Sequence, residues 1–262
     1  MRVIRFLRDG EVAAGVVDHE GVVHDAGDDP LRPTPRGPAL GPVDELELLA
    51  PVAPPKVVCV GVNYVAHGSE AGMAPPDAPL LFAKFPTSVV GPGAAIVVPP
   101  GSTQVDYEAE LGVVIGRRTS GVSTAAALAS VWGYTCVNDV SARDMQFADG
   151  QWVRGKSQDT FCPIGPAVVT ADEIEDPQSL EVSCLVNGEL RQRASTADMI
   201  FGVAELISYI SRGITLEPGD VIATGTPAGV GMSMDPPRYL ADGDVVEVRV
   251  SGVGALRNPV VA

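Results

Sequence analysis

Residues 106–116 read D-Y-E-A-E-L-G-V-V-I-G, and this stretch predicts a β-strand at the centre of the protein. Apolar and acidic residues alternate in its first half, and an apolar run typical of a buried strand follows. Because side chains two positions apart leave the same face of a strand, Glu108 and Glu110 are expected to lie side by side. Two neighbouring carboxylates repel each other unless a cation lies between them, and a divalent cation is the usual solution.

A third carboxylate, Asp139, belongs to the stretch N-D-V-S-A-R-D at residues 138–144. It follows a short apolar run containing Tyr134, Cys136 and Val137, which suggests a second strand. Glu-x-Glu followed by a distant Asp would supply a site made of oxygen ligands, which suits Mg2+ or Mn2+. The spacing alone leaves a second interpretation open, because Glu-x-Glu is common and also occurs on solvated strand faces.

The composition favours one large domain, or one domain with a small appendage, built from short strands and turns. The chain has 262 residues, of which 45% are hydrophobic, so it can bury a proper core. Its 29 Gly and 23 Pro favour structured turns over a helix bundle. Short strands without a β-α-β rhythm predict an α+β, mainly β fold.

The charge and the cysteines limit the partners and the compartment. A formal net charge of −15 argues against nucleic acid, whose binding needs clustered Lys and Arg. No apolar run reaches the roughly 18 residues of a membrane span, and the start M-R-V-I-R-F-L-R-D-G is too charged for a signal peptide. We therefore expect a cytoplasmic protein with reduced, buried thiols at its four separated cysteines, Cys59, Cys136, Cys162 and Cys184.

The chain is predicted to divide into a small N-terminal β subdomain with a linker, residues 1–50, and a main body, residues 51–262. Three β-like runs in residues 1–26 are separated by Asp-Gly and Glu-Gly turns, which fits a meander. Residues 27–44 are rich in Pro, Gly and Asp and are expected to form a linker or long loop. In the main body, helices are expected over residues 123–131 and, with a strongly amphipathic pattern, over residues 196–212.

A possible catalytic pair lies in G-V-N-Y-V-A-H-G-S-E-A-G, residues 61–72. His67 and Glu70 are three residues apart, so on a helical turn they share a face and can form a hydrogen bond. Gly68 and Gly72 make this segment a poor helix in isolation, and a short glycine-bearing segment flanked by loops is a plausible lid. The alternative is that His67 only caps a turn.

Residues 150–157, G-Q-W-V-R-G-K-S, match the phosphate-binding loop pattern, but their surroundings do not. Such a loop must leave a buried strand and open a helix. The residues before it are not a buried strand, and Pro163 and Pro166 soon after it prevent a sustained helix. A nucleotide hydrolase is therefore not supported, although Lys156 could still point into a site as a fixed cation.

A second glycine-rich element is T-G-T-P-A-G-V-G at residues 224–231, which follows the predicted strand D-V-I-A. Such a turn, with its two Thr hydroxyls, can present backbone N–H groups to a carboxylate. A tight turn that serves packing alone is the alternative from the residues themselves.

Seven blocks of the sequence, in order, resemble the fumarylacetoacetate hydrolase family from about residue 56 to the C-terminus. The resemblance implies a mixed β-sandwich roll, so residues 51–262 would form the catalytic domain, and it implies a homodimer that holds Mg2+ or Mn2+. The blocks are G-V-N-Y-V-A-H-G-S-E, V-V-G-P-G, D-Y-E-A-E-L-G-V-V-I-G, N-D-V-S-A-R-D-M-Q, R-G-K-S-Q-D-T-F-C-P-I-G-P, L-E-P-G-D-V-I-A-T-G-T-P-A-G-V-G and G-A-L-R-N-P-V-V.

The same resemblance implies a role for each candidate site residue. The metal ligands of the family correspond to Glu108, Glu110 and Asp139. The catalytic residues correspond to His67 and Glu70 of the lid and to Lys156, and the substrate contacts to Arg143, Gln146, Gly225 and Thr226. Gln158 after G-K-S, and Phe85 where many relatives have Pro, are small departures that bear on substrate identity.

The activity that the resemblance implies is metal-dependent hydrolysis of a C–C bond in a small oxo-acid substrate. Acylpyruvates of the fumarylpyruvate and acetylpyruvate class would be cleaved by water that His67 and Glu70 activate, with Lys156 stabilising the oxyanion and the metal holding the enolate. An oxaloacetate-type decarboxylase, or a 2-hydroxyhepta-2,4-diene-1,7-dioate isomerase or decarboxylase, is the alternative on the same site. An inactive binding protein with this fold is the alternative from another class.

Overall fold

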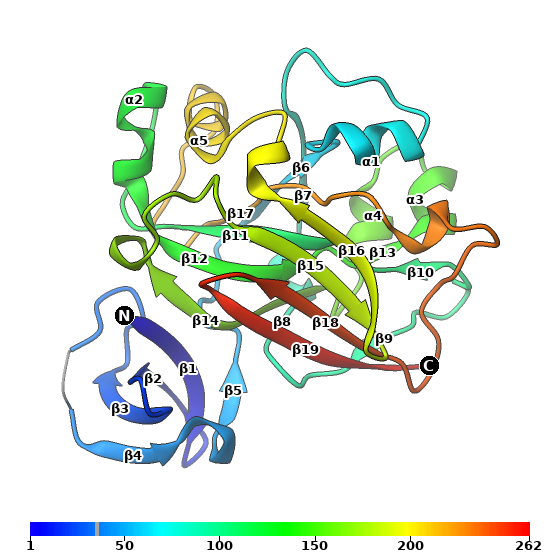
Figure 1. Cartoon of the computed structure of the whole chain (residues 1–262). Coiled ribbons are helices and arrows are strands. Elements are labelled where there is room, and N and C mark those ends of the chain that lie inside the picture. The colour runs from blue at the N-terminus through cyan, green and yellow to red at the C-terminus, as the bar shows by residue number, and fades with distance from the viewer. Residues whose placement is uncertain (35–36) are drawn as a thin grey trace.

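The computed structural model describes residues 1–34 and 37–262, and it confirms a mainly β fold with mixed sheets (Figure 1). A large sheet has the order β4-β3-β2-β1-β14-β12-β11-β17-β6-β7, with β5 on β1 and β8 on β14. Its strands are β1 (Arg2–Arg8), β2 (Glu11–Val17), β3 (Val22–Gly27), β4 (Ala39–Pro42), β5 (Glu47–Leu49), β6 (Val57–Gly61), β7 (Leu80–Lys84), β8 (Val89–Val90), β11 (Ala109–Ile115), β12 (Val131–Asn138), β14 (Cys162–Thr170) and β17 (Val221–Ala223).

A second sheet of five strands packs on the middle of the first. Its order is β16-β15-β18-β19-β9, formed by β9 (Ile96–Val97), β15 (Glu181–Val186), β16 (Glu189–Ser195), β18 (Val245–Val250) and β19 (Gly254–Val261). The main core joins Leu111 and Val113 of β11 to Val182 of β15 and to Val246 and Val248 of β18. Every residue of β11 is buried, which explains why the strand runs apolar over residues 111–115 instead of continuing to alternate.

The short helices gather near the ends of these strands. A two-stranded ladder of β10 (Val105–Asp106) and β13 (Ser141–Ala142) lies beside the helices α3 and α4. Helices α1, α3 and α4 lie at one end of the sheets, and α2 and α5 lie together at the other (Figure 1). The helices are α1 (Val65–Glu70), α2 (Thr124–Ala127), α3 (Arg143–Ala148), α4 (Val153–Lys156) and α5 (Val203–Ser211).

The N-terminal meander is part of the large sheet. Val3 of β1 pairs with Val168 of β14, and Ile4, Phe6 and Ala167 share one small core. The predicted linker, residues 27–44, is wrong in part, because β4 forms there and pairs with β3; its residues 35–36 lie outside the described residues. Proline is compatible with this outer position, since an edge strand can lack one N–H donor.

Both predicted helices are shorter than the sequence suggests. The helix expected over residues 196–212 begins only at Val203, because the amides of Ile200 and Phe201 donate to the backbone and side-chain oxygens of Asn63, at 2.8 Å each. Gly202 then starts the helix, and its N–H donates to Glu205. The helix expected over residues 123–131 ends as a 3-10 turn at Ser130, and Val131 already belongs to β12.

Two expectations about the whole chain can be compared with the structure. All four cysteines are free and buried, as predicted. Among the described residues, no helix has both the length and the apolar character needed to cross a membrane.

Candidate active site

The three predicted metal ligands meet at the end of the β11–β12 pair. Ala109 is in register with Asn138, so Glu108 lies just before one strand and Asp139 just after its antiparallel neighbour. The Asp139 N–H donates to the Glu108 carbonyl at 2.9 Å, which joins the two strand ends. One ligand oxygen each from Glu108, Glu110 and Asp139 lies within 4.8 Å of the others, and all three residues are buried. Strand pairing therefore creates the acidic cluster.

Lysine and arginine neutralise two of these carboxylates. The Lys156 ammonium lies 2.9 Å from Glu108 and 2.8 Å from Asp139, and Arg143 lies 2.7 Å from Glu108. Lys84 at the end of β7 contacts the other oxygen of Asp139 at 2.5 Å. Burial alone would raise the pKa of Glu108, but Lys156 and Arg143 hold that pKa well below its usual range.

Glu110 has a different environment. Within the described part of the chain no Lys or Arg forms an ion pair with it, and its recorded hydrogen bond comes from the Gly225 N–H at 2.8 Å. Burial, followed by the charges of Asp139 and Glu108, raises its pKa well above the usual range. A buried carboxylate of this kind, beside two others, fits a divalent cation, which would supply the missing positive charge. The oxygen-only ligand set suits Mg2+ or Mn2+.

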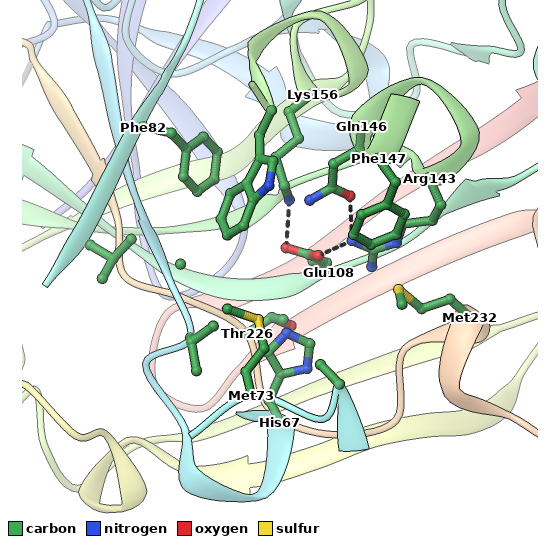
Figure 2. Close-up of a pocket in the computed structure, with 15 residues that line it drawn as sticks. His67, Met73, Phe82, Glu108, Arg143, Gln146, Phe147, Lys156, Thr226 and Met232 are labelled. Carbon is green, nitrogen blue, oxygen red and sulfur yellow. Dashed lines mark hydrogen bonds and ion pairs between the residues drawn. The ribbon is translucent and has the colours of Figure 1, made fainter. Parts of the chain in front are cut away.

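His67 and Glu70 form the predicted pair on α1. The His67 Nδ1 atom lies 2.9 Å from a carboxylate oxygen of Glu70. Glu70 also accepts the N–H of Gly229, at 2.9 Å and 3.1 Å to its two oxygens, so the glycine-rich loop fixes its orientation. The His67 ring lies on the opposite side of Glu108 from Lys156 and Gln146 (Figure 2).

Arg143 and Gln146 lie one turn apart on α3 and contact each other at 3.1 Å. Asp106, which the sequence analysis missed, accepts from the Arg143 Nε atom at 2.9 Å and from the amides of Gly231 and Met232. The carboxylate thereby fixes the guanidinium against the glycine-rich loop. Position in the acidic stretch was the only available signal for Asp106, since no spacing rule marks it.

The G-x-x-x-x-G-K-S stretch is not a phosphate loop, as expected. It contains only the four-residue helix α4, and β14 starts at Cys162 soon afterwards. Its second glycine has a packing role, because a Cβ atom at Gly155 would lie 2.6 Å from the backbone nitrogen of Gln146. Close contact between α3 and α4 places Lys156 beside Arg143 and Gln146.

Gly225 and Thr226, the two candidate substrate-binding residues of the T-G-T-P turn, have different positions. Thr226 lines the pocket, and its hydroxyl donates to the Ala109 carbonyl and accepts from Gln192, at 3.0 Å and 2.8 Å. Gly225 is predicted to contact the substrate as well, but its N–H donates to Glu110 in the structure. Gly225 adopts a φ of +99°, and a Cβ there would lie 2.6 Å from the Asn63 side chain, so this position favours glycine.

The pocket combines a charged floor with an apolar rim. Glu108, Arg143, Gln146 and Lys156 form the floor, and His67 forms one wall (Figure 2). The rim consists of large apolar side chains from five separate segments: Met73, Phe82, Phe147, Trp152 and Met232. Lys84, Glu110 and Asp139 are not among the described residues that line the pocket; they lie behind the floor. Such a pocket suits a small anion with an apolar part.

Comparisons with known proteins identify the family of the chain. A family model described as fumarylacetoacetate (FAA) hydrolase C-terminal matches residues 56–261, and one described as Rv2993c-like, N-terminal matches residues 1–51. The mitochondrial oxaloacetate tautomerase Fahd2a of Rattus norvegicus is 46% identical over 84% of this chain and 71% of its own length.

Solved structures share the whole fold. A fumarylacetoacetate hydrolase from Exiguobacterium antarcticum has a TM-score of 0.91 and 43% identity, with 100% of this chain and 99% of that chain covered. A 5-carboxymethyl-2-hydroxymuconate delta-isomerase from Mycobacterium smegmatis has a TM-score of 0.87 and 40% identity, with the same coverage. The chain belongs to the fumarylacetoacetate hydrolase family.

Proposed function

We propose that this enzyme is a divalent-metal-dependent isomerase that moves a proton at the carbon next to the 2-oxo group of a small oxo acid. The related tautomerases and isomerases support this reaction class. The observation that carries the proposal is the position of the His67–Glu70 pair across one pocket from the Glu108, Arg143 and Lys156 cluster. An acid–base residue thus faces the groups that would bind the oxo-acid head.

Glu108, Glu110 and Asp139 would hold the cation. When bound, a divalent cation supplies Lewis-acid polarisation of the 2-oxo oxygen, which acidifies the neighbouring C–H bond. Arg143 and Lys156 attract and orient the substrate carboxylate on the pocket floor. Lys156 can leave its carboxylate partners for a substrate oxygen, while Lys84 keeps its contact with Asp139 from behind.

His67 moves the proton. Its Nδ1 atom is engaged by Glu70, so Nε2 is the ring nitrogen that is available to the substrate. As a base it takes the proton from the carbon next to the 2-oxo group, and as an acid it returns a proton to the other end of the enol system. Glu70 orients the ring during these two transfers, and the Gly229 N–H keeps Glu70 in place.

The test is the rate of oxaloacetate enol–keto conversion, with Mn2+ and with EDTA, for the wild type and for His67→Ala. We expect the substitution to lower kcat by roughly 100-fold to 10,000-fold, since general acid–base catalysis contributes that much. The Kd for Mn2+, measured by calorimetry, should stay unchanged, because His67 is not among the acidic ligands. A wild-type rate in His67→Ala would remove the residue from the mechanism.

Hydrolysis of acylpyruvates is the second candidate, favoured by the 43% identity to the Exiguobacterium antarcticum enzyme. Here His67 would take the proton of a water molecule that attacks the 4-oxo carbon, and Lys156 would stabilise the resulting oxyanion. Release of pyruvate from acetylpyruvate or fumarylpyruvate would establish this reaction, and turnover of oxaloacetate to pyruvate and CO2 would establish a decarboxylase. Bound metal without turnover of any of these compounds would favour a binding protein.

A further inference from the structure

The rim of the pocket exposes more apolar surface than the proposed proton transfer needs. We name Met73, Phe82, Phe147, Trp152 and Met232 the apolar collar. Phe147 is 60% exposed and Met73 is 40% exposed, although both line a pocket whose floor is charged. Exposed apolar side chains that gather around a concave site mark a binding surface, because their contact with water is unfavourable until a ligand covers them.

Packing holds the aromatic side of the collar in place. The rings of Phe82 and Trp152 meet edge to face, with centroids 5.5 Å apart and an interplanar angle of 72°. A Cβ atom at Gly61 would lie 2.6 Å from the Trp152 ring, so the glycine leaves room for the indole. Met73 and Met232 supply flexible thioether side chains, which adapt to the shape of a ligand.

The collar carries no positive charge. Among the described pocket-lining residues, the cationic side chains are Arg143 and Lys156, which belong to the floor, and His67 stands on the wall. Arg154 follows the collar residue Trp152, but it is exposed and forms an ion pair with Asp149. The Lys156 ammonium lies 5.1 Å from the centroid of the Phe82 ring, but it donates hydrogen bonds to Glu108, Asp139 and Ser141 on the floor. A carboxylate placed among the collar residues would lose water and would compete with the floor for this ammonium, which is unfavourable.

We infer that the collar is a subsite for an uncharged, apolar or flat unsaturated substituent that a 2-oxo acid carries beyond its head. This inference rests on the proposed function, because the head must first bind on the charged floor. A four-carbon dicarboxylate would stay over that floor and leave the collar empty. A longer dicarboxylate would place its second charge in the collar, so the structure favours apolar acyl or aryl derivatives over long dicarboxylates.

Binding of unreactive head analogues tests the subsite separately from catalysis. Oxamate, N-phenyloxamate and N-(4-carboxyphenyl)oxamate share one 2-oxo-acid head and differ only in the substituent that reaches the collar. With Mn2+ present, calorimetry should show N-phenyloxamate binding on the order of tenfold more tightly than oxamate, since burial of a ring contributes about this much. The second carboxylate of N-(4-carboxyphenyl)oxamate should cancel this gain in affinity.

Phe147 provides the matching variants, because its exposed side chain on α3 can be replaced without opening the core. Phe147→Ala should reduce the ratio of the affinity for N-phenyloxamate to the affinity for oxamate. Phe147→Lys should raise the affinity for N-(4-carboxyphenyl)oxamate relative to that for N-phenyloxamate. Leu190→Lys, at a 52% exposed position that does not line the pocket, is the control and should leave the relative affinities for the three compounds at their wild-type values.

The outcomes separate the two proposals. Normal oxamate affinity without a phenyl gain, or a gain that neither Phe147 variant changes, would overturn the subsite and leave the proposed function standing. Equal or tighter binding of the carboxyphenyl compound to the wild type would also overturn the subsite. Absence of oxamate binding in the presence of Mn2+ would overturn the proposed function and the subsite with it.

Discussion

Glu110 is the residue on which the charge balance of the acidic cluster depends. Its carboxylate lies beside those of Glu108 and Asp139, and the Gly225 N–H is the contact that orients it. Its pKa is raised in the folded protein by burial and by these two neighbours, so the folded chain holds the Glu110 proton more tightly than the unfolded chain does. This tighter binding of the proton stabilises the folded protein at a pH below the pKa of Glu110 in the unfolded chain. The stabilisation is lost as the pH rises through the pKa of Glu110 in the folded protein.

We expect Glu110→Gln to raise the melting temperature of the EDTA-treated protein, and to raise it more as the pH increases. The amide keeps the shape of the side chain and cannot become charged, and about 1 kcal/mol corresponds to roughly 2–4 °C for a chain of this size. Mn2+ should stabilise the wild type and should not stabilise the variant. Thermal melts across a pH series measure both effects, and a melting temperature below that of the wild type at every pH in EDTA would contradict this charge balance.

Lys84 is the second residue with a consequence of its own, because it is fully buried behind Asp139. Lys84→Met should destabilise the protein by about 3–5 kcal/mol, since it leaves a buried carboxylate with one cationic partner fewer. It should also weaken Mn2+ binding by roughly 10-fold to 100-fold, the usual effect of removing a group that orients a ligand.

Urea unfolding and calorimetric titration with Mn2+ measure the two effects of Lys84→Met. The control is Arg193→Met, which breaks an exposed ion pair with Glu181 and should cost less than about 1 kcal/mol. An equal, small loss of unfolding free energy in both variants, with unchanged affinity for Mn2+, would mean that Lys84 does not position Asp139.

The residues of the site differ in how far the sequence could predict them. Glu108, Glu110, His67 and Glu70 stand at spacings that a strand or a helical turn brings together, and the structure does bring them together. Lys84 has no such signal, because it reaches Asp139 only through strand pairing that no local spacing reveals. Asp106 is hidden for the same reason, since its partners come from α3 and from the distant glycine-rich loop.

At the scale of elements, the contact between α3 and α4 positions three side chains of the pocket. Gly155 permits this contact, since a Cβ atom would meet the backbone of Gln146 at 2.6 Å. We expect Gly155→Ala to destabilise the protein by about 1–3 kcal/mol, as overpacking usually does, and to lower kcat/KM for oxaloacetate through displacement of Gln146 and Lys156.

Denaturant unfolding and steady-state kinetics check this expectation for Gly155→Ala. Gly213→Ala is the matched control, because a Cβ there meets no atom within 4 Å. Wild-type kinetics in Gly155→Ala would show that the pocket tolerates separation of the two helices.

The elements that the sequence predicted well are those with a strong local pattern. The strands around Glu110, Val182 and Val246 follow from their runs of apolar and β-branched residues. The start of α5 could not be predicted, since the apolar pattern continues through Met199 and Ile200 although their backbone turns to meet Asn63 and Tyr64. Hydrogen bonds to Asn63, which is distant in the sequence, therefore override the helical pattern of this segment.

At the scale of the whole molecule, burial protects the thiols. It raises the pKa values of Cys136 and Cys162 to about 12, and Cys59 and Cys184 are buried as well. A thiol-exchange reagent at pH 8 should therefore react with none of the four in the folded protein and with all four in urea. Rapid reaction of a thiol without denaturant would indicate an opening of the core.

We also propose that the chain forms a homodimer and acts on a small molecule in the cytoplasm. Light scattering during gel filtration should give twice the 27.1 kDa of one chain. A mass of one chain at micromolar concentration would contradict the dimer.

The pairing of β1 with β14 bears on how this protein can be shortened. Residues 1–51 match a family model of their own, yet their first strand covers the edge of β14, and Phe6 shares a core with Ala167. A chain trimmed to residues 52–262 would keep every residue of the proposed site but would expose an unpaired strand edge beside an apolar patch. Such edges recruit other strands, so the trimmed protein should aggregate through the exposed edge of β14.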